Sequence, residues 1–347
     1  MPYNQNPLDY SLLERLTQTF GPSGVEEKVT SAIADEVRPY CDEMKTDTLG
    51  NLIAIRRGTG KKIMIAAHVD EIGVMITHID EKGYLRFAPI GGISIRELPH
   101  RRVLFQSGRW GTIGVEKLEK PIDLKLDKLY IDIGATSQEE AKTHVSIGES
   151  AVFAGNFIKQ EKRITAKAMD DRVGCFVAIE VMKRLKSNHE IYFVFTVQEE
   201  VGTRGAQIAA FALEPDLAIA LDVTGTGDTP KAHPMDVKLG HGAAIKVFDR
   251  SMITHPKIKS WMADTAEQYN IPYQWEVLEY GGTDSGAIHL SKGGIPSGVI
   301  SIPTRYIHSP SETVDQGDIE GAVQLLLALL EGPAELAMMQ GSARAPY

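Results

Sequence analysis

Two acidic residues stand side by side at the end of an apolar run. Glu199 and Glu200 close the segment IYFVFTVQEE, whose apolar part has the length and composition of a buried strand. Adjacent carboxylates can divide two tasks, because one can bind a metal ion while the other transfers a proton. The alternative is a solvated strand end, which fits less well directly after so many apolar residues.

Other residues of metal-ligand type stand near the ends of further predicted elements. His68 follows IMIAA, Asp222 follows LAIAL, and His308 lies beyond GVISI. Because the carboxyl ends of parallel strands meet at one edge of an α/β sheet, these side chains can converge there. Asp170 stands at the start of a predicted helix, where unpaired N–H groups favour a carboxylate. Imidazole and carboxylate ligands suit zinc, manganese or cobalt, and the set suffices for two ions if one carboxylate bridges them.

Each of these residues also has a plain structural interpretation. A lone histidine after a strand is more often a hydrogen-bonded structural residue than a ligand. Asp170 and Asp171 could be a helix cap and an acidic first turn. Asp70 shares a face of the extended segment with His68, so its carboxylate could hold the imidazole proton, but a solvated loop acid fits as well. The metal-site hypothesis therefore depends on all these residues coinciding at one sheet edge.

Helical and strand patterns alternate in the first and last parts of the chain. This alternation predicts an α/β sandwich with a mixed, largely parallel sheet. The first two strands flank Gly-Thr-Gly, which predicts a hairpin or a tight connection. Helices are predicted at 11–19, 26–38, 172–186, after Gly202, at 259–269, at 285–293 and from about 316; strands are predicted at 51–58, 61–68, 190–197, 216–223, 272–279 and 296–302.

Residues 71–163 have a different pattern of short alternating runs cut by glycines and charged turns. Only 137–144 resembles a helix there. The pattern predicts a small β domain, barrel-like in form, inserted into an α/β domain made of 1–70 and 164–347.

Composition limits the possible partners and the location of the chain. The 347 residues carry a formal charge of −9 without a basic cluster, so a nucleic-acid partner is not expected. The longest apolar stretch, AVQLLLALLEG, is too short to span a membrane, and the N-terminal segment lacks the pattern of a secretory signal. Cys41 and Cys175 are too few for a disulfide framework, which favours a cytoplasmic protein.

Six segments in a fixed order carry a family resemblance. They are AAHVDEIG, AMDDRVG, QEEVG, ALDVT, GGTDSG and PTRYIHS, and together they resemble the M42 family of metal-dependent aminopeptidases, some of which are labelled glutamyl or deblocking aminopeptidase or endoglucanase. The resemblance implies a zinc-peptidase-like α/β sandwich with two metal ions per subunit. It also implies that the inserted β domain, at 71–163 here, helps subunits to assemble, commonly as a tetrahedral dodecamer.

The resemblance assigns a role to each candidate residue. Asp170 would bridge both metals, and the peptide bond between Asp170 and Asp171 would be cis. Glu199 would be the general base, and Asp70 would be the partner of His68. The metal ligands would be His68, Asp170, Glu200, Asp222 and His308.

These roles define a mechanism and its competitors. Two metals about 3.5–4 Å apart would activate a bridging water, while Glu199 accepts its proton and passes it to the leaving amine of a peptide. A related dimetal deacylase or carboxypeptidase, and a non-catalytic assembly protein, remain alternatives. A glucanase is a poor fit, because its two carboxylates must flank a sugar bond at about 5 to 9.5 Å, whereas Glu199 and Glu200 are adjacent.

Several nearby residues receive no catalytic role. Thr283 and Asp284 in GGTDSG fit a glycine turn that feeds a helix cap. Arg305 could shape a substrate pocket or pair with Asp171 or another acid. The segment IGGISIRELPH departs from the family, where many members carry Trp after the two glycines, so the detail of this loop stays open. Histidines without a ligand pattern are His78, His100, His144, His233, His241, His255 and His289.

Overall fold

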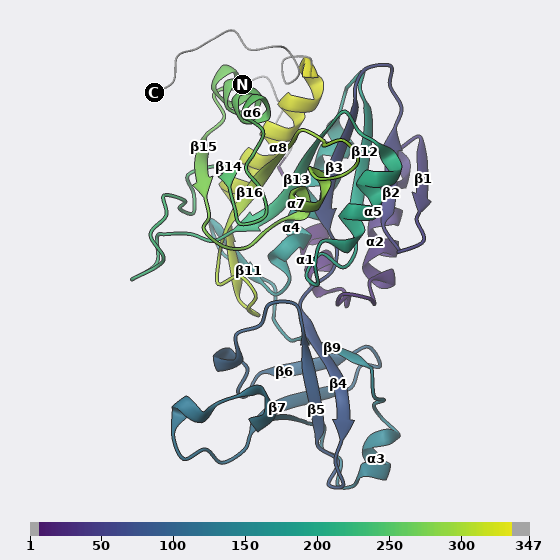
Figure 1. Ribbon diagram of the computed structural model, residues 1–347, viewed down its shortest axis with the longest axis vertical. Helices are drawn as coiled ribbons and strands as arrows, with labels where there is room; N and C mark the ends of the chain where they lie inside the picture. The colour runs from purple at the N-terminus through teal and green to yellow at the C-terminus, as the bar shows by residue number, and fades with distance from the viewer. Residues whose placement is uncertain (1–6, 335–347) are drawn as a thin grey trace.

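The computed structural model describes residues 7–334, and the terminal stretches 1–6 and 335–347 lie outside the described part. The first residues of the N-terminal segment, and the ends of the predicted α/β domain, therefore fall outside it. Two bodies of structure are joined one above the other in Figure 1, an α/β part and a smaller β part below it. The described helices are α1 (Tyr10–Gln18), α2 (Glu27–Val37), α3 (Gln138–Lys142), α4 (Met169–Arg184), α5 (Arg204–Leu213), α6 (Pro256–Tyr269), α7 (Asp284–Ile288) and α8 (Gln316–Glu331).

A mixed sheet forms the centre of the α/β part. Along the sheet the strands are β1 (Glu43–Thr46), β2 (Leu52–Arg56), β12 (Glu190–Thr196), β3 (Lys62–His68), β13 (Leu217–Thr224), β16 (Ser297–Arg305), β17 (Glu312–Asp315), β11 (Arg163–Ala166) and β10 (Ile158–Lys159), with β14 (Ala243–Phe248) and β15 (Tyr273–Val277) branching from β16. The central strands β12, β3, β13 and β16 are parallel, and both flanks are antiparallel. The predicted α/β sandwich with a mixed sheet is confirmed.

Alternating residues of the central strands face two helical layers. In β3, Ile63 and Ile65 pack with α4 and α8 in one buried cluster, whereas Met64 packs with α5 in another. Because both faces are covered, these strands are apolar throughout instead of alternating with polar residues. Burial on both sides fixes the register of the strands and, with it, the positions of the residues at their ends.

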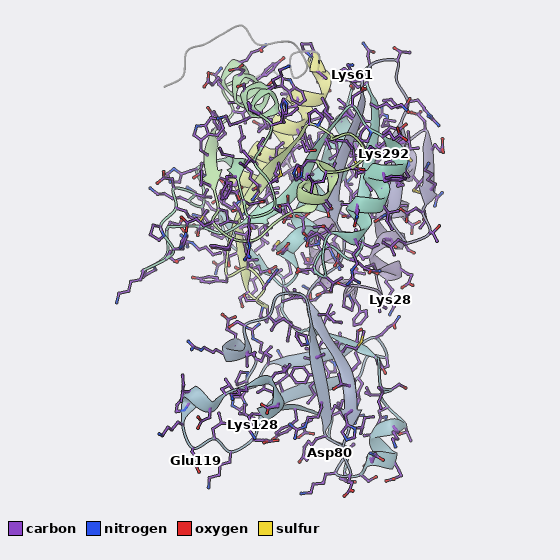
Figure 2. All side chains as sticks on the ribbon, viewed as in Figure 1. Lys28, Lys61, Asp80, Glu119, Lys128 and Lys292 are labelled. Carbon is purple, nitrogen blue, oxygen red and sulfur yellow. The ribbon has the colours of Figure 1, made fainter. Side chains whose placement is uncertain are left out.

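The smaller part is a closed antiparallel barrel with its own apolar core. Its strands, in order around the barrel, are β4 (Gly73–Ile79), β5 (Leu85–Ile90), β8 (Leu129–Asp132), β7 (Trp110–Val115), β6 (Arg102–Phe105) and β9 (Ser150–Phe153). The chain enters it directly after β3 and returns to the large sheet through β10 and β11. The barrel therefore extends from the edge of the sheet at which β3 ends, and Asp80, labelled in Figure 2, marks its far end.

One expected connection is different in the structure. The strands β2 and β3 do not form a hairpin, because β12 lies between them and pairs with both. Their link is tight for another reason: a Cβ on Gly58 would lie 2.3 Å from the carbonyl oxygen of Asn188. Glycine is needed there for the close approach of two backbones.

Among the helices within residues 7–334, none is long and apolar enough to cross a membrane.

Candidate metal centre

The predicted ligands meet at the edge where the parallel strands end. His68 is the last residue of β3, and it pairs with Thr196, the last residue of β12, just ahead of Glu199 and Glu200. Asp222 lies near the end of the neighbouring strand β13. These positions follow from the parallel register, which brings equivalent ends of separate strands to one level.

Asp170 lies between two histidines that are distant in the sequence. Its Oδ1 is 2.9 Å from His68 Nε2, and its Oδ2 is 3.2 Å from His308 Nε2. His308 Nε2 also lies 3.3 Å from Glu200 Oε2. Two groups of side chains can therefore hold an ion, and within each the donor atoms lie within 4.8 Å of one another: His68, Asp170 and Asp222 in the first, and Asp170, Glu200 and His308 in the second.

The backbone at Asp170 departs from helical geometry. The Asp170–Asp171 peptide is cis, as the family resemblance implied, and both residues have non-helical dihedral angles. Asp171 Oδ1 accepts the N–H of Gly174 at 3.0 Å, so Asp171 acts as the cap of the regular part of α4. The cap interpretation thus holds for Asp171, while Asp170 faces the histidines.

Burial and like charge dominate the electrostatics of the site. Burial raises the pKa of Glu199, Glu200 and Asp222 above the ordinary values, and neighbouring acids add to the effect. Burial also opposes the ionised form of Asp170, but hydrogen bonds with His308 and His68 lower its pKa. The raised pKa values of Glu199, Glu200 and Asp222 indicate that too little positive charge surrounds these buried carboxylates.

The residues present fit a divalent cation. Glu200 Oε1 and Asp171 Oδ2 are buried and have no hydrogen-bond partner among the described residues. A buried carboxylate oxygen without a donor is costly, and a cation relieves that cost. Imidazole and carboxylate donors without thiolate suit zinc, cobalt or manganese.

Asp70 holds the loop that carries both glutamates. Its Oδ1 accepts the N–H of Glu199 at 2.9 Å, and its Oδ2 accepts the N–H of Glu200 at 3.1 Å and the hydroxyl of Ser23 at 2.6 Å. His68 Nδ1 lies 3.1 Å from the backbone carbonyl of Asp70 and 3.6 Å from the carboxylate. The carbonyl is therefore the hydrogen-bond acceptor that turns Nε2 toward Asp170, and the expected contact with the carboxylate is longer than a hydrogen bond.

Glu312 is a site residue that sequence reasoning missed. Its Oε2 accepts the N–H of Asp170 at 3.1 Å, and its Oε1 accepts the N–H of His308 at 2.7 Å. Burial raises its pKa to about 8. The available signal was weak, since it consisted of an acid in HSPSE at the start of a short strand.

Two other acids near the site have settled partners. Asp284 is buried and accepts a hydrogen bond from the hydroxyl of Thr196, at the end of β12. Arg305 pairs with Asp228 through two hydrogen bonds of 3.0 and 2.7 Å, and this answers the open question of its partner.

The histidines that lacked a ligand pattern do not join a group able to hold an ion in residues 7–334. Cys175 is fully buried, and its thiol donates to the carbonyl of His68 at 3.1 Å.

An α/β sandwich whose strand ends gather imidazoles and carboxylates around one aspartate defines a protein with a site suited to cations. Residues 50–325 match the sequence profile of the family described as M42 glutamyl aminopeptidase. The chain belongs to this family, and it is a peptidase. A putative aminopeptidase of Acetivibrio thermocellus is 55% identical over 92% of this chain and 97% of the relative.

Solved structures agree with this assignment across nearly the whole chain. The TET aminopeptidase of a marine sediment archaeon, Thaumarchaeota archaeon SCGC AB-539-E09, is similar with a TM-score of 0.91 and 36% identity, covering 94% of this chain and 98% of that one. The TET1 peptidase of Pyrococcus horikoshii is similar with a TM-score of 0.82 and 36% identity, covering 92% and 98%. The latter is described as able to assemble into a tetrahedron or a large octahedral shell.

Proposed function

We propose that this protein is an aminopeptidase that removes N-terminal residues from peptides with the help of two divalent metal ions. The observation that carries the proposal is the position of Asp170, whose two oxygens face His68 on one side and His308 on the other. His68 and Asp222 would complete one ion site, and Glu200 with His308 the other, with Asp170 shared. The aminopeptidase names of its relatives support the choice of substrate.

Glu199 is the residue proposed to move the proton. When bound, two divalent ions would supply Lewis acidity and would lower the pKa of a water molecule to near neutrality. Glu199 is half-buried beside His68 and Asp222, and its backbone is fixed by Asp70. Burial raises the pKa of its carboxyl, which suits a group that must accept a proton and then release it to the leaving amine.

The same reasoning extends to the metals. The donor set of two imidazoles and three carboxylates supports zinc or cobalt, and manganese is a further candidate.

The barrel is proposed to take part in assembly. We propose that residues 71–163 form an inserted domain for oligomerisation, that 1–70 with 164–347 form the catalytic domain, and that subunits associate as a tetrahedral dodecamer. The assemblies described for the similar TET1 peptidase support this. We also propose a cytoplasmic location, which rests on the two cysteines, both free.

The test separates metal binding from proton transfer. A metal-reconstituted Glu199→Gln variant should keep both ions and the assembly of the wild type, but lose most hydrolysis of an aminoacyl-nitroanilide. Glu119→Gln, which removes an exposed acid on the barrel (Figure 2), should match the wild type in every respect. Near-wild-type turnover by Glu199→Gln would refute the assigned base. Hydrolysis of N-acylated peptides or of cellulose in preference to free N-termini would refute the aminopeptidase proposal.

A further inference from the structure

A loop of the barrel reaches the proposed metal ligands. It consists of Gly91 and Gly92, directly after β5, and we call it the diglycine loop. The nearest atoms to a Cβ built on Gly91 are Ile72 Cγ2 at 2.7 Å and Glu200 Oε2 at 3.0 Å. A Cβ on Gly92 would lie 3.1 Å from His308 Nδ1 and 3.2 Å from Cε1.

The space beside each glycine is therefore too small for a Cβ at its ordinary contact distance. Gly91 also has a φ of +80°, a conformation that favours glycine. Gly92 is not in that region of φ, so the close approach to His308 is the main steric limit at that position. A backbone that lies beside a carboxylate and an imidazole with so little free space limits the directions in which both can move.

The barrel is held firmly at the point from which this loop extends. Glu71, just before the barrel, and Lys167, just after it, form a buried ion pair of 2.6 Å. Arg172 of α4 lies 3.6 Å from the same carboxylate and donates to the carbonyl of Val69 at 2.6 Å. These contacts tie the chain entering the barrel to the segment that follows β11 and to α4, close to the strand ends.

The contact is confined to one half of the proposed site. The side chains that a Cβ on these glycines would crowd include Glu200 and His308, which belong to the second group of donors. The first group is completed by His68 and Asp222, which come from the parallel strands β3 and β13. Strand register positions His68 and Asp222. Glu200 and His308 lie on loops, where Asp70 and Glu312 hold their backbone N–H groups and the diglycine loop lies beside their side chains.

We propose that the diglycine loop is a positioning element for the second metal site, in which the inserted barrel supplies a steric stop that keeps Glu200 and His308 in the geometry for binding an ion. The inference rests on the proposed two-metal function. It adds a role for the barrel within a single subunit, separate from assembly.

The test adds bulk at Gly92 and measures metal binding directly. Metal-free wild type, Gly92→Ala and Gly92→Val are titrated with zinc, and the number of ions per subunit and their affinities are determined by calorimetry and metal analysis. Gly92→Val should bind one ion with wild-type affinity and the other at least about tenfold more weakly, because the added bulk displaces His308 and changes in the surroundings of a metal ligand have effects of this scale. In Gly92→Ala the added Cβ requires a shift of only a few tenths of an ångström. The affinity of this variant for the weakened ion should lie between those of the wild type and Gly92→Val.

Controls identify the site that is weakened. Gly293→Val is the matched control, because a Cβ there meets nothing within 4 Å and φ is not positive; it should bind two ions as the wild type does. In a His308→Ala background, which removes a second-site ligand, Gly92→Val should not weaken the remaining ion further. Thermal melting shows whether each variant folds, and if Gly92→Val does not, Gly92→Ala decides.

Two outcomes overturn the inference while leaving the function intact. One is a folded Gly92→Val, or Gly92→Ala in its place, that binds both ions with wild-type affinity. The other is an equal loss of metal affinity at both sites. A wild type that binds fewer than two ions would instead contradict the proposed function itself.

Discussion

Glu312 Oε1 accepts the backbone N–H of His308 at 2.7 Å, and the other oxygen of the same carboxylate accepts the N–H of Asp170 at 3.1 Å. One buried side chain thus joins the loop after β16 to the start of α4. The two residues it joins are the ones whose side chains meet at 3.2 Å in the proposed site. Glu312 therefore acts on the site through the backbone of its neighbours.

Replacing Glu312 should weaken metal binding without removing a ligand. Glu312→Ala leaves two buried N–H groups without an acceptor, and Glu312→Gln keeps one acceptor oxygen for two donors. We expect the affinity for metal and kcat/KM to fall by about 10- to 100-fold in the alanine variant, and less in the glutamine variant. Metal titration and peptide hydrolysis measure this, with the exposed Glu320→Gln as control. Equal metal affinity in wild type and Glu312→Ala would contradict the positioning role.

Asp70→Asn tests the support of the glutamate loop. An amide offers one acceptor oxygen where the carboxylate now accepts from both Glu199 and Glu200, so one N–H would face an amide NH2 group. We expect kcat to fall by about 10- to 100-fold. Ser23→Ala removes the third donor to Asp70 but keeps the carboxylate, and it should cost only about 1 kcal/mol of stability and little activity. If Asp70→Asn and Ser23→Ala behaved alike, the support would not depend on the carboxylate.

Removing metal should destabilise the protein. Carboxylates whose pKa is raised by burial stand together at the site, and a bound cation offsets their repulsion. Each ion present at 100 times its Kd stabilises the fold by about 2.7 kcal/mol. The thermal midpoint should therefore fall after dialysis against a chelator and recover on addition of zinc. The recovery should be smaller in Asp222→Asn, which lacks one ligand, and an unchanged midpoint in the chelated wild type would argue against a site filled by metal.

The ion pair of Asp228 and Arg305 should give an acid-dependent contribution to stability. The hydrogen bond from Arg305 holds the pKa of Asp228 below its ordinary value. A depressed carboxyl pKa stabilises the fold above the unfolded value near 3.8, and this stability is lost as the pH falls through the folded value. Because the pair is partly exposed, Asp228→Asn should cost no more than about 1 kcal/mol at pH 7.

The measurement is the urea midpoint of wild type and Asp228→Asn at several pH values. The urea midpoint of the wild type should exceed that of Asp228→Asn at pH 7, and this difference should become smaller as the pH falls below about 4. Asp236→Asn, an exposed acid of the same loop, should show no such trend. A difference in urea midpoint that grows as the pH falls would have the opposite sign and would exclude the ion pair of Asp228 and Arg305 as its cause.

Sequence patterns predicted the strands at the centre of the sheet, although the mostly buried strand β14 was missed. The apolar runs ending at His68 and Thr196 predicted β3 and β12, because a strand covered on both faces has few polar residues. Two short strands were not predicted: β1 at the sheet edge and β17 between β16 and β11. Both carry little apolar sequence and owe their conformation to pairing with neighbours. The pairing order of the strands was not predicted either, because β12 comes to lie between β2 and β3 only in the folded chain.

The candidate site shows the same division. The donor groups could be proposed because residues of metal-ligand type coincide at strand ends and match the segments that carry the family resemblance. The contacts of Glu312 and of the diglycine loop could not, since the sequence shows an acid and two glycines but not which distant groups they meet in the folded chain. The boundaries of the inserted domain and the roles of the site residues stay predictions.

The place at which the barrel enters the chain has a consequence for biosynthesis. His68 leaves the ribosome before the barrel, Asp170 after it, and His308 and Glu312 close to the end of the described chain. A nascent or truncated polypeptide therefore carries only part of the proposed centre. Under the proposed two-metal function, a copy that ends before His308 would lack a donor of the second group and could not bind both ions.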